Sequence, residues 1–186
     1  MNRLLYRLAG NLPCRIISDN GQPYLERYYL FTLLGVRFYL HRFVGSDPDR
    51  GLHDHPWPWA GSVVLHGFYY EETRKGLHKV RWLNWLTGDS FHRVILPCAH
   101  AYPDMPCSQH VSYGVSHPAG GERPCWTLFF HRAAYTKPWG FLRQTDSESV
   151  MRVWVPFNYP KDGAGTPGAW WNEVPIGKLE SRRAPL

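Results

Sequence analysis

The sequence predicts a single all-β domain, and three observations support this fold class. Gly (17) and Pro (16) are plentiful, and aromatic residues make up 16% of the 186 positions. Aromatic side chains favour strands, whereas Gly and Pro favour the turns between strands. Short apolar segments also follow one another at short, even intervals. This spacing is typical of a sandwich or a barrel.

The expected elements begin with a short helix at residues 1–11, where three leucines share one face and Gly10 is a stop signal. Residues 1–23 form an N-terminal segment that leads into the domain. Strands are then expected at 24–31, 36–44, 61–70, 78–85, 90–96, 125–131, 139–141 and 150–157.

The domain itself is expected at 24–157, because no internal repeat or linker divides the chain. A long inserted loop at 97–124 is rich in Pro, Gly, Cys and His. Long irregular loops in compact domains often act as lids, and we expect this role here. Residues 158–186 are expected to form a wrapped or frayed C-terminal tail.

The composition argues against several classes of partner. The formal net charge is +6, but the basic residues are scattered and no nucleic-acid-binding motif is present. No apolar run approaches the length of a membrane span, and the first residues lack the pattern of a signal peptide. The four cysteines show no CxxC spacing. We therefore expect a reduced, cytoplasmic protein that binds neither nucleic acid nor membrane.

A histidine pair organises the chain, in the run His53-Asp54-His55-Pro56-Trp57-Pro58-Trp59. Residues i and i+2 of a strand point to one face about 6–7 Å apart, so two imidazoles can converge on one metal ion. On a helix the same two side chains would diverge. Asp54 is expected on the opposite face, where it would support the ligands. Trp57 and Trp59 are expected to line a substrate pocket.

A third histidine follows a Gly-Asp turn, in the run Gly88-Asp89-Ser90-Phe91-His92-Arg93-Val94. Together with the histidine pair, Cys125-Trp126-Thr127-Leu128 and Trp139-Gly140-Phe141, this run resembles the cupin superfamily. Within it, the chain resembles a group of small uncharacterised bacterial cupins with a His-Asp-His-Pro-Trp motif. The resemblance implies a cupin jelly-roll β-barrel that holds a metal ion on His53, His55 and His92.

The sequence departs from the cupin pattern in two ways. Cupins carry a Glu seven positions before the Gly that closes the first motif; here that Gly is Gly67 and the earlier position is Ala60, so the acidic ligand is missing. The insertion also offers His100 as an alternative third ligand. A second, structural zinc site in or beside the insertion is a further alternative. Its candidate ligands are Cys98, His100, Cys107, His110, His117 and Cys125.

Three neutral imidazoles leave a bound divalent ion with a net +2 charge and open positions. Cupins with three His and no acid resemble thiol dioxygenases and diketone-cleaving dioxygenases, which use non-haem Fe(II). We therefore expect an Fe(II)-dependent oxygenase of a small anionic or thiol-bearing substrate, with Zn, Mn, Ni or Cu as alternative metals. Arg42 or Arg93 would pair with a substrate carboxylate.

Two other functions stay open: a metal-dependent sensor or carrier without turnover, and a metal-free cupin isomerase or epimerase. Glu71 and Glu72 are expected to be exposed to solvent. A homodimer through an edge strand is a further expectation. Four histidines are expected to be ordinary core or surface residues. They are His41, His66, His78 and His131.

Overall fold

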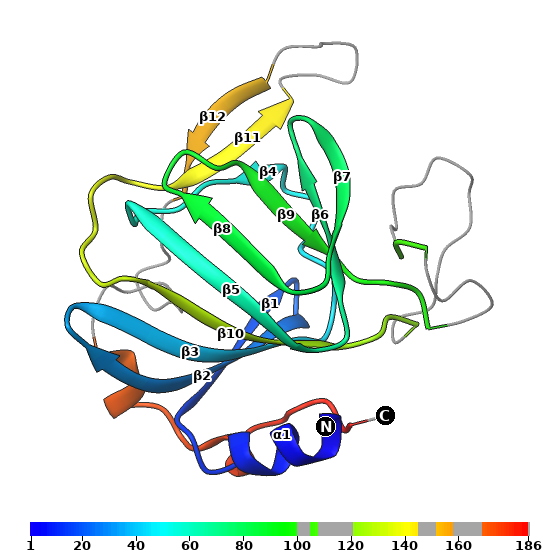
Figure 1. The fold of residues 1–186 in the computed structure, drawn as a ribbon, viewed down its shortest axis with the longest axis vertical. Helices are drawn as coiled ribbons and strands as arrows, with labels where there is room; N and C mark the ends of the chain where they lie inside the picture. Colours follow the sequence, from blue (N-terminus) through cyan, green and yellow to red (C-terminus); the bar gives the residue numbers. More distant parts are fainter. Residues whose placement is uncertain (100–104, 108–120, 145–151, 158–168, 186) are drawn as a thin grey trace.

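The computed structural model describes residues 1–99, 105–107, 121–144, 152–157 and 169–185. Within these residues the chain forms two six-stranded sheets that face each other and enclose a barrel (Figure 1). All strand pairings are antiparallel. The expected all-β fold is therefore confirmed, and α1 (Asn2–Ala9) is the expected short helix. No helix of the described chain is long and apolar enough to cross a membrane.

The first sheet has the order β1-β2-β3-β10-β5-β8, and the second has the order β12-β11-β4-β9-β6-β7. The strands of the first sheet are β1 (Cys14–Asp19), β2 (Gln22–Leu33), β3 (Val36–Phe43), β10 (Cys125–Arg132), β5 (Trp59–His66) and β8 (Leu83–Thr87). Those of the second are β12 (Arg152–Pro156), β11 (Gly140–Gln144), β4 (Leu52–His53), β9 (His92–Ile95), β6 (Tyr69–Thr73) and β7 (Gly76–Val80). From β3 onward the chain repeatedly crosses between the sheets, as in a jelly roll.

Three strand expectations need correction. The expected strand at 78–85 is two strands in different sheets, β7 and β8, with Arg81 and Trp82 between them. The expected strand at 61–70 is two strands, β5 and β6, because Gly67 has a φ of 80° and turns the chain from one sheet to the other. A strand also forms before residue 24, since β1 pairs with β2 in a hairpin. The hairpin turns at Asn20-Gly21, and both residues have positive φ, as a type I′ turn requires.

A polar layer crosses the interior of the barrel between two apolar clusters. One cluster includes Val64, Tyr69, Val94 and Cys125, and the other includes Tyr39, Ala60 and Phe129. On each of the strands β3, β5 and β10, one buried polar residue lies between the part of the strand that packs in the first cluster and the part that packs in the second. The polar layer consists of His41, Ser62 and Thr127 on these strands, with Glu71 and His92 on the second sheet.

The outer face of the first sheet is covered by α1 and the C-terminal segment, which lie beside each other (Figure 1). Tyr28, Leu40 and Trp126 pack there against Ala9 and Cys14. The C-terminal segment includes two short 3-10 helices, η1 (Trp170–Asn172) and η2 (Gly177–Leu179). Its backbone bonds to the end of α1, with Lys178 N donating to Gly10 O at 2.8 Å. The described part of the tail, 169–185, is therefore wrapped onto the domain.

Arg42 lies beneath this covering layer and not in the barrel interior. Its side chain is fully buried, pairs with Glu26 at 3.1 Å and donates to the backbone oxygens of Arg183 and Ala184 at 2.5 and 3.3 Å. Its guanidinium also lies 5.4 Å from the centre of the Trp126 ring. The structure thus does not bring Arg42 to a substrate pocket, because it occupies the opposite face of the sheet and ties the C-terminal segment to it.

We predict that Arg42→Met destabilises the fold by about 3–5 kcal/mol, because it leaves Glu26 as a buried unpaired charge. Arg50→Met is the control, since Arg50 pairs with Asp19 at 3.5 Å with both side chains partly exposed. Its loss should stay below about 1 kcal/mol. Denaturant unfolding measures both free energies, and equal losses in the two variants would contradict the assignment.

Candidate metal centre

The structure brings the three predicted histidines together. His53 on β4 pairs directly with His92 on β9, and His55 follows two residues after His53. The ring centres lie 4.7 Å apart for His53 and His92, 5.2 Å for His53 and His55, and 5.1 Å for His55 and His92. One nitrogen from each ring lies within 4.8 Å of the others. The strand is shorter than the sequence suggested, because β4 ends at His53.

The nitrogen positions fit a single metal ion. His55 Nε2 and His92 Nε2 lie 2.9 Å apart. Two imidazoles bound at right angles, each about 2.0–2.1 Å from a metal, would place their nitrogens about 2.9 Å apart. Imidazole nitrogen is a ligand that Zn, Cu, Fe and Ni all accept, so the donor set fits a divalent transition metal without identifying it.

Glu71 fixes the orientation of His92. Its Oε1 lies 2.5 Å from His92 Nδ1 and accepts from Asn84 Nδ2, also at 2.5 Å. An imidazole that donates Nδ1–H to a carboxylate keeps its Nε2 lone pair available for a metal. Burial raises the pKa of Glu71, but the hydrogen bonds from His92 and Asn84 outweigh this effect, so the pKa lies below its ordinary value.

The expectation that Glu71 is exposed was wrong, since only 3% of it is accessible. Its second oxygen pairs with His78 Nε2 at 3.0 Å, and His78 exposes 53% of its side chain. Glu71 is therefore one residue of the candidate site that the sequence analysis missed. Glu72, its neighbour, faces the other way and pairs with Arg93.

Asp47 lies behind His53 and is a second residue that the sequence analysis did not single out. Its Oδ2 is 4.0 Å from His53 Nδ1 and accepts a hydrogen bond from Val94 N at 2.8 Å. The Asp47 backbone N donates in turn to Val94 O. The loop before β4 is thereby tied to β9, the strand that carries His92.

Two of the three histidines, His53 and His55, are held neutral by their surroundings. Burial lowers the pKa of His53 and of His55 well below the ordinary histidine value, and the nearby charge of His92 lowers both further. A metal ion binds the neutral imidazole, so it does not compete with protons for these two ligands at neutral pH.

An aromatic wall surrounds the cluster. Trp57 is buried and stacks between His55, with ring centres 5.0 Å apart, and His131, at 3.8 Å. Trp139 and Phe141 lie 6.2 and 6.0 Å from His53. Of the two predicted pocket tryptophans, the structure thus brings Trp57 to the histidines.

Three other predicted site residues lie away from the histidine rings. Trp59 stacks on Trp85 at 5.3 Å, on the outer face of the first sheet. Arg93 points away from His92 along β9 and pairs with Glu72 and with Asp49, at 2.5 and 2.6 Å. Arg42 is beneath the C-terminal segment, as described above. The structure therefore brings neither arginine to the cluster.

Asp54 supports the backbone that carries the histidine pair. It is 1% exposed and accepts from Gly140 N at 2.7 Å and from Lys137 Nζ at 2.9 Å. Asp54 N also donates to Gly140 O. These bonds attach the segment after β4 to the start of β11. The alternative ligand His100 and the zinc candidates His110 and His117 lie outside the described residues.

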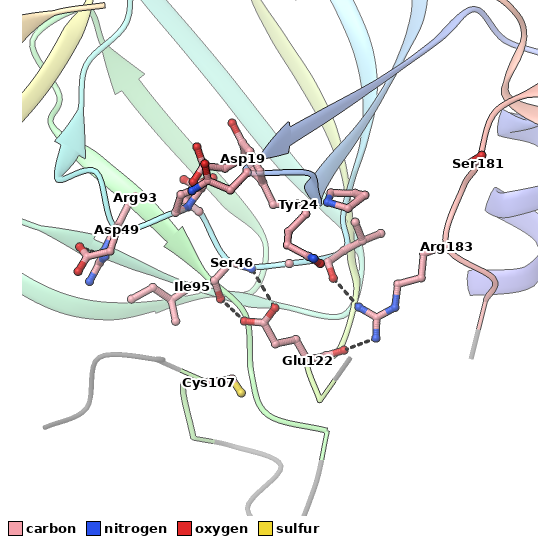
Figure 2. A pocket seen from close by; sticks show the side chains of 17 residues that line it. Asp19, Tyr24, Ser46, Asp49, Arg93, Ile95, Cys107, Glu122, Ser181 and Arg183 are labelled. Carbon is pink, nitrogen blue, oxygen red and sulfur yellow. Dashed lines mark hydrogen bonds and ion pairs between the residues drawn. The ribbon is translucent and has the colours of Figure 1, made fainter. Parts of the chain in front are cut away.

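The larger of two described cavities, about 610 Å³, is not lined by the three histidines. Figure 2 shows it between the loop after β3, β9 and the C-terminal segment, with Glu122 contacting Ser46 near its middle. Asp47 lines this cavity and separates it from His53. His53 itself exposes 19% of its side chain, so the histidine cluster is in partial contact with solvent.

No family model matches the sequence, and no curated protein matches it. Among solved structures, the chain is similar to a cupin-2 domain protein of Rhodospirillum rubrum (16% identity, covering 74% of this chain and 76% of that one, TM-score 0.45). It is similar to a cupin 2 conserved barrel domain protein of Rhodopseudomonas palustris (11%, 76% and 91%, TM-score 0.48). It is also similar to Fe(II) HppE (8%, 64% and 56%, TM-score 0.42). The observed barrel of two antiparallel sheets agrees with the all-β barrel expected from the sequence.

We predict that Glu71→Gln weakens metal binding about 10- to 100-fold, because the charge that orients His92 is lost. Glu72→Gln is the matched control, since Glu72 faces the outside of the barrel and pairs with Arg93. Competitive titration with Co²⁺ measures the affinity of each variant. Equal affinities in the two variants would contradict the role given to Glu71.

Buried histidines also predict how stability depends on pH. His41 accepts a hydrogen bond from Arg27 Nε at 3.0 Å, and burial, followed by the charge of Arg27, lowers its pKa well below the ordinary value. The unfolded chain takes up this proton near pH 6.5, so the stability present above that pH is lost as the pH falls. The loss reaches up to about 1.4 kcal/mol for this residue at pH 5.5.

His41→Gln, which keeps an acceptor for Arg27, should therefore lose less stability than the wild type between pH 7.5 and 5.5. Denaturant unfolding in the presence of a chelator measures the difference without a contribution from metal. Identical losses in the two proteins would show that His41 is protonated in the fold.

Proposed function

We propose that this protein is a mononuclear metal-binding cupin that uses Fe(II) to oxygenate a small anionic or thiol-bearing substrate. The observation that carries the proposal is the convergence of His53, His55 and His92 on one point inside the barrel. Among the described residues, this group contains three imidazoles and no carboxylate. An ion held there keeps its full positive charge and has open positions for other ligands.

The charge of such a centre favours an anionic ligand. The nearest carboxylates, Glu71 and Asp47, face the Nδ1 atoms of His92 and His53. They hold the imidazoles in place from behind and leave the ion to be neutralised by substrate. A thiolate or carboxylate would meet this need. Bound Fe(II) would supply the activation of molecular oxygen.

The residues around the centre would keep it dry and rigid. Trp57 covers one face of His55, and Trp139 and Phe141 lie against His53. Exclusion of water strengthens electrostatic interactions within a site. The partial exposure of His53 leaves a route by which a small substrate reaches the open positions.

A second candidate is a metal-dependent binding protein without turnover. One observation is compatible with it: the three histidines do not line either of the two cavities described above. Oxygen consumption distinguishes this candidate from the oxygenase.

The test begins with metal content, measured by mass spectrometry on anaerobically purified wild type, His92→Ala, His100→Ala and His66→Ala. We expect about one iron per chain in the wild type, loss of iron in His92→Ala, and retention in His66→Ala, which lies outside the cluster. Loss in His100→Ala instead of His92→Ala would move the third ligand into the insertion.

The iron-loaded protein is then mixed with small thiols and carboxylic acids while dissolved oxygen is recorded. Substrate-dependent oxygen uptake that is absent in His92→Ala would support the oxygenase. Bound metal without uptake would support the binding protein, and a wild type that binds no metal would overturn both candidates.

A further inference from the structure

A second cavity, of about 480 Å³, lies on the outer face of the second sheet and is lined by four arginines. These are Arg50, Arg93, Arg143 and Arg152. The three histidines do not line this cavity, so any ligand of the cavity is separate from the proposed metal site. Cavities that bind small molecules commonly have volumes of about 300–1,000 Å³, so the space is large enough for a ligand.

Strand alternation places one of these arginines, Arg93, on this face. His53 and His92 point into the barrel, so their neighbours Leu52 and Arg93 point outward. Leu142 pairs with Leu52, and Glu72 pairs with Arg93. The floor of the cavity is therefore the back of the strands that carry the metal-site histidines. We call this cavity the arginine groove.

The two carboxylates that line the groove are bonded to one and the same arginine. Arg93 donates from Nε to Glu72 and from a terminal nitrogen to Asp49, at 2.5 and 2.6 Å. Arg50 pairs with Asp19 at 3.5 Å, in a bridge whose side chains are partly exposed. For Arg143 and Arg152, no acidic partner is found within the part of the chain that the structure describes. Among the described residues that line the groove, four arginines are therefore present beside two carboxylates.

Two of the guanidiniums are oriented by a single aromatic ring. Arg50 lies 5.0 Å and Arg143 lies 5.6 Å from the centre of the Phe141 ring. Cation–π contacts of this kind restrict the two arginine side chains before a ligand binds. The loss of side-chain conformational entropy on binding is therefore smaller. Positive charges held near one another repel, and an anion bound between them would lower this electrostatic energy.

The neighbouring larger cavity has the opposite character. It shares Asp49 and Arg93 with the groove, and Figure 2 shows this pair at one end of it. Three further carboxylates line it, from Asp19, Asp47 and Glu122, against one further arginine, Arg183. An anion would therefore enter the groove and not the larger cavity.

We propose that the arginine groove binds a small polyanion that carries phosphate groups. Guanidinium forms paired hydrogen bonds to phosphate oxygens, and several arginines together match a ligand with at least two negative charges. This site is distinct from the histidine centre, and its ligand does not depend on which metal that centre holds.

Isothermal titration of the purified full-length protein with pyrophosphate tests the proposal. We compare the wild type with the double variant Arg143→Gln/Arg152→Gln, which removes the two groove arginines that have no acidic partner among the described residues. The matched control is Arg74→Gln/Arg81→Gln, which removes the same charge from arginines that lie over Phe91 and Phe68, outside the groove. We expect one pyrophosphate per chain, at least tenfold weaker binding in the groove variant, and less than a twofold change in the control.

His92→Ala separates the groove from the metal centre, because pyrophosphate also binds metal ions. Binding that persists in His92→Ala and is lost in the groove variant supports the proposal. Three results would overturn it: no binding by the wild type, equal weakening in the groove and control variants, or loss of binding in His92→Ala alone. The last result would place pyrophosphate on the metal without contradicting the proposed function.

Discussion

The contact between the Glu71 carboxylate and His92 Nδ1 is the interaction on which the centre of the barrel depends. Glu71 comes from β6 in the second sheet, whereas its donor Asn84 comes from β8 in the first. The same carboxylate thus links the two sheets and orients a candidate metal ligand. A buried carboxylate is costly unless several donors satisfy it, and His92, Asn84 and His78 meet that requirement. The Glu71 carboxylate is thus stabilised by partners from three different strands.

The polar layer continues from Glu71 and His92 across the barrel to the first sheet. His41 on β3 pairs with Thr127 on the adjacent strand β10. Along both strands, apolar residues lie on either side of this pair in the barrel interior. A slip of one residue in any of these strands would turn the polar side chain outward and place an apolar one in the layer. Polar groups in a low-dielectric interior are favourable only when they have hydrogen-bond partners, so His41, Glu71 and His92, which have such partners, favour this register. The Thr127 hydroxyl has no partner among the described residues and does not contribute to this selection. The apolar clusters supply stability, and the layer supplies specificity.

The local His-x-His spacing predicted the pair His53 and His55, and the resemblance to the cupin motifs added His92, with His100 as the alternative. The sequence did not predict the role of Glu71, because Glu71 and Glu72 are adjacent and alternation sends one in and one out. Which of them points inward depends on the pairing of β6 with β9, which joins residues about 20 positions apart. Arg42 was misplaced for a related reason. Helix α1 and the C-terminal segment cover the outer face of the first sheet around Arg42, so both faces are buried there and the sequence pattern does not identify the interior.

The strands β4 and β9 present different chemistry on their two faces. Their inner faces carry His53 and His92, and their outer faces carry Leu52 and Arg93 in the arginine groove. Phe141 strengthens the connection, since its ring lies 6.0 Å from His53 and also contacts Arg50 and Arg143. An anion that moves these arginines would therefore change the surroundings of His53. By thermodynamic linkage, the metal would then change the affinity for the anion by the same factor as the anion changes the affinity for the metal. Because β4 consists only of Leu52 and His53, the two sites meet at adjacent residues of one strand, which is where such coupling would pass.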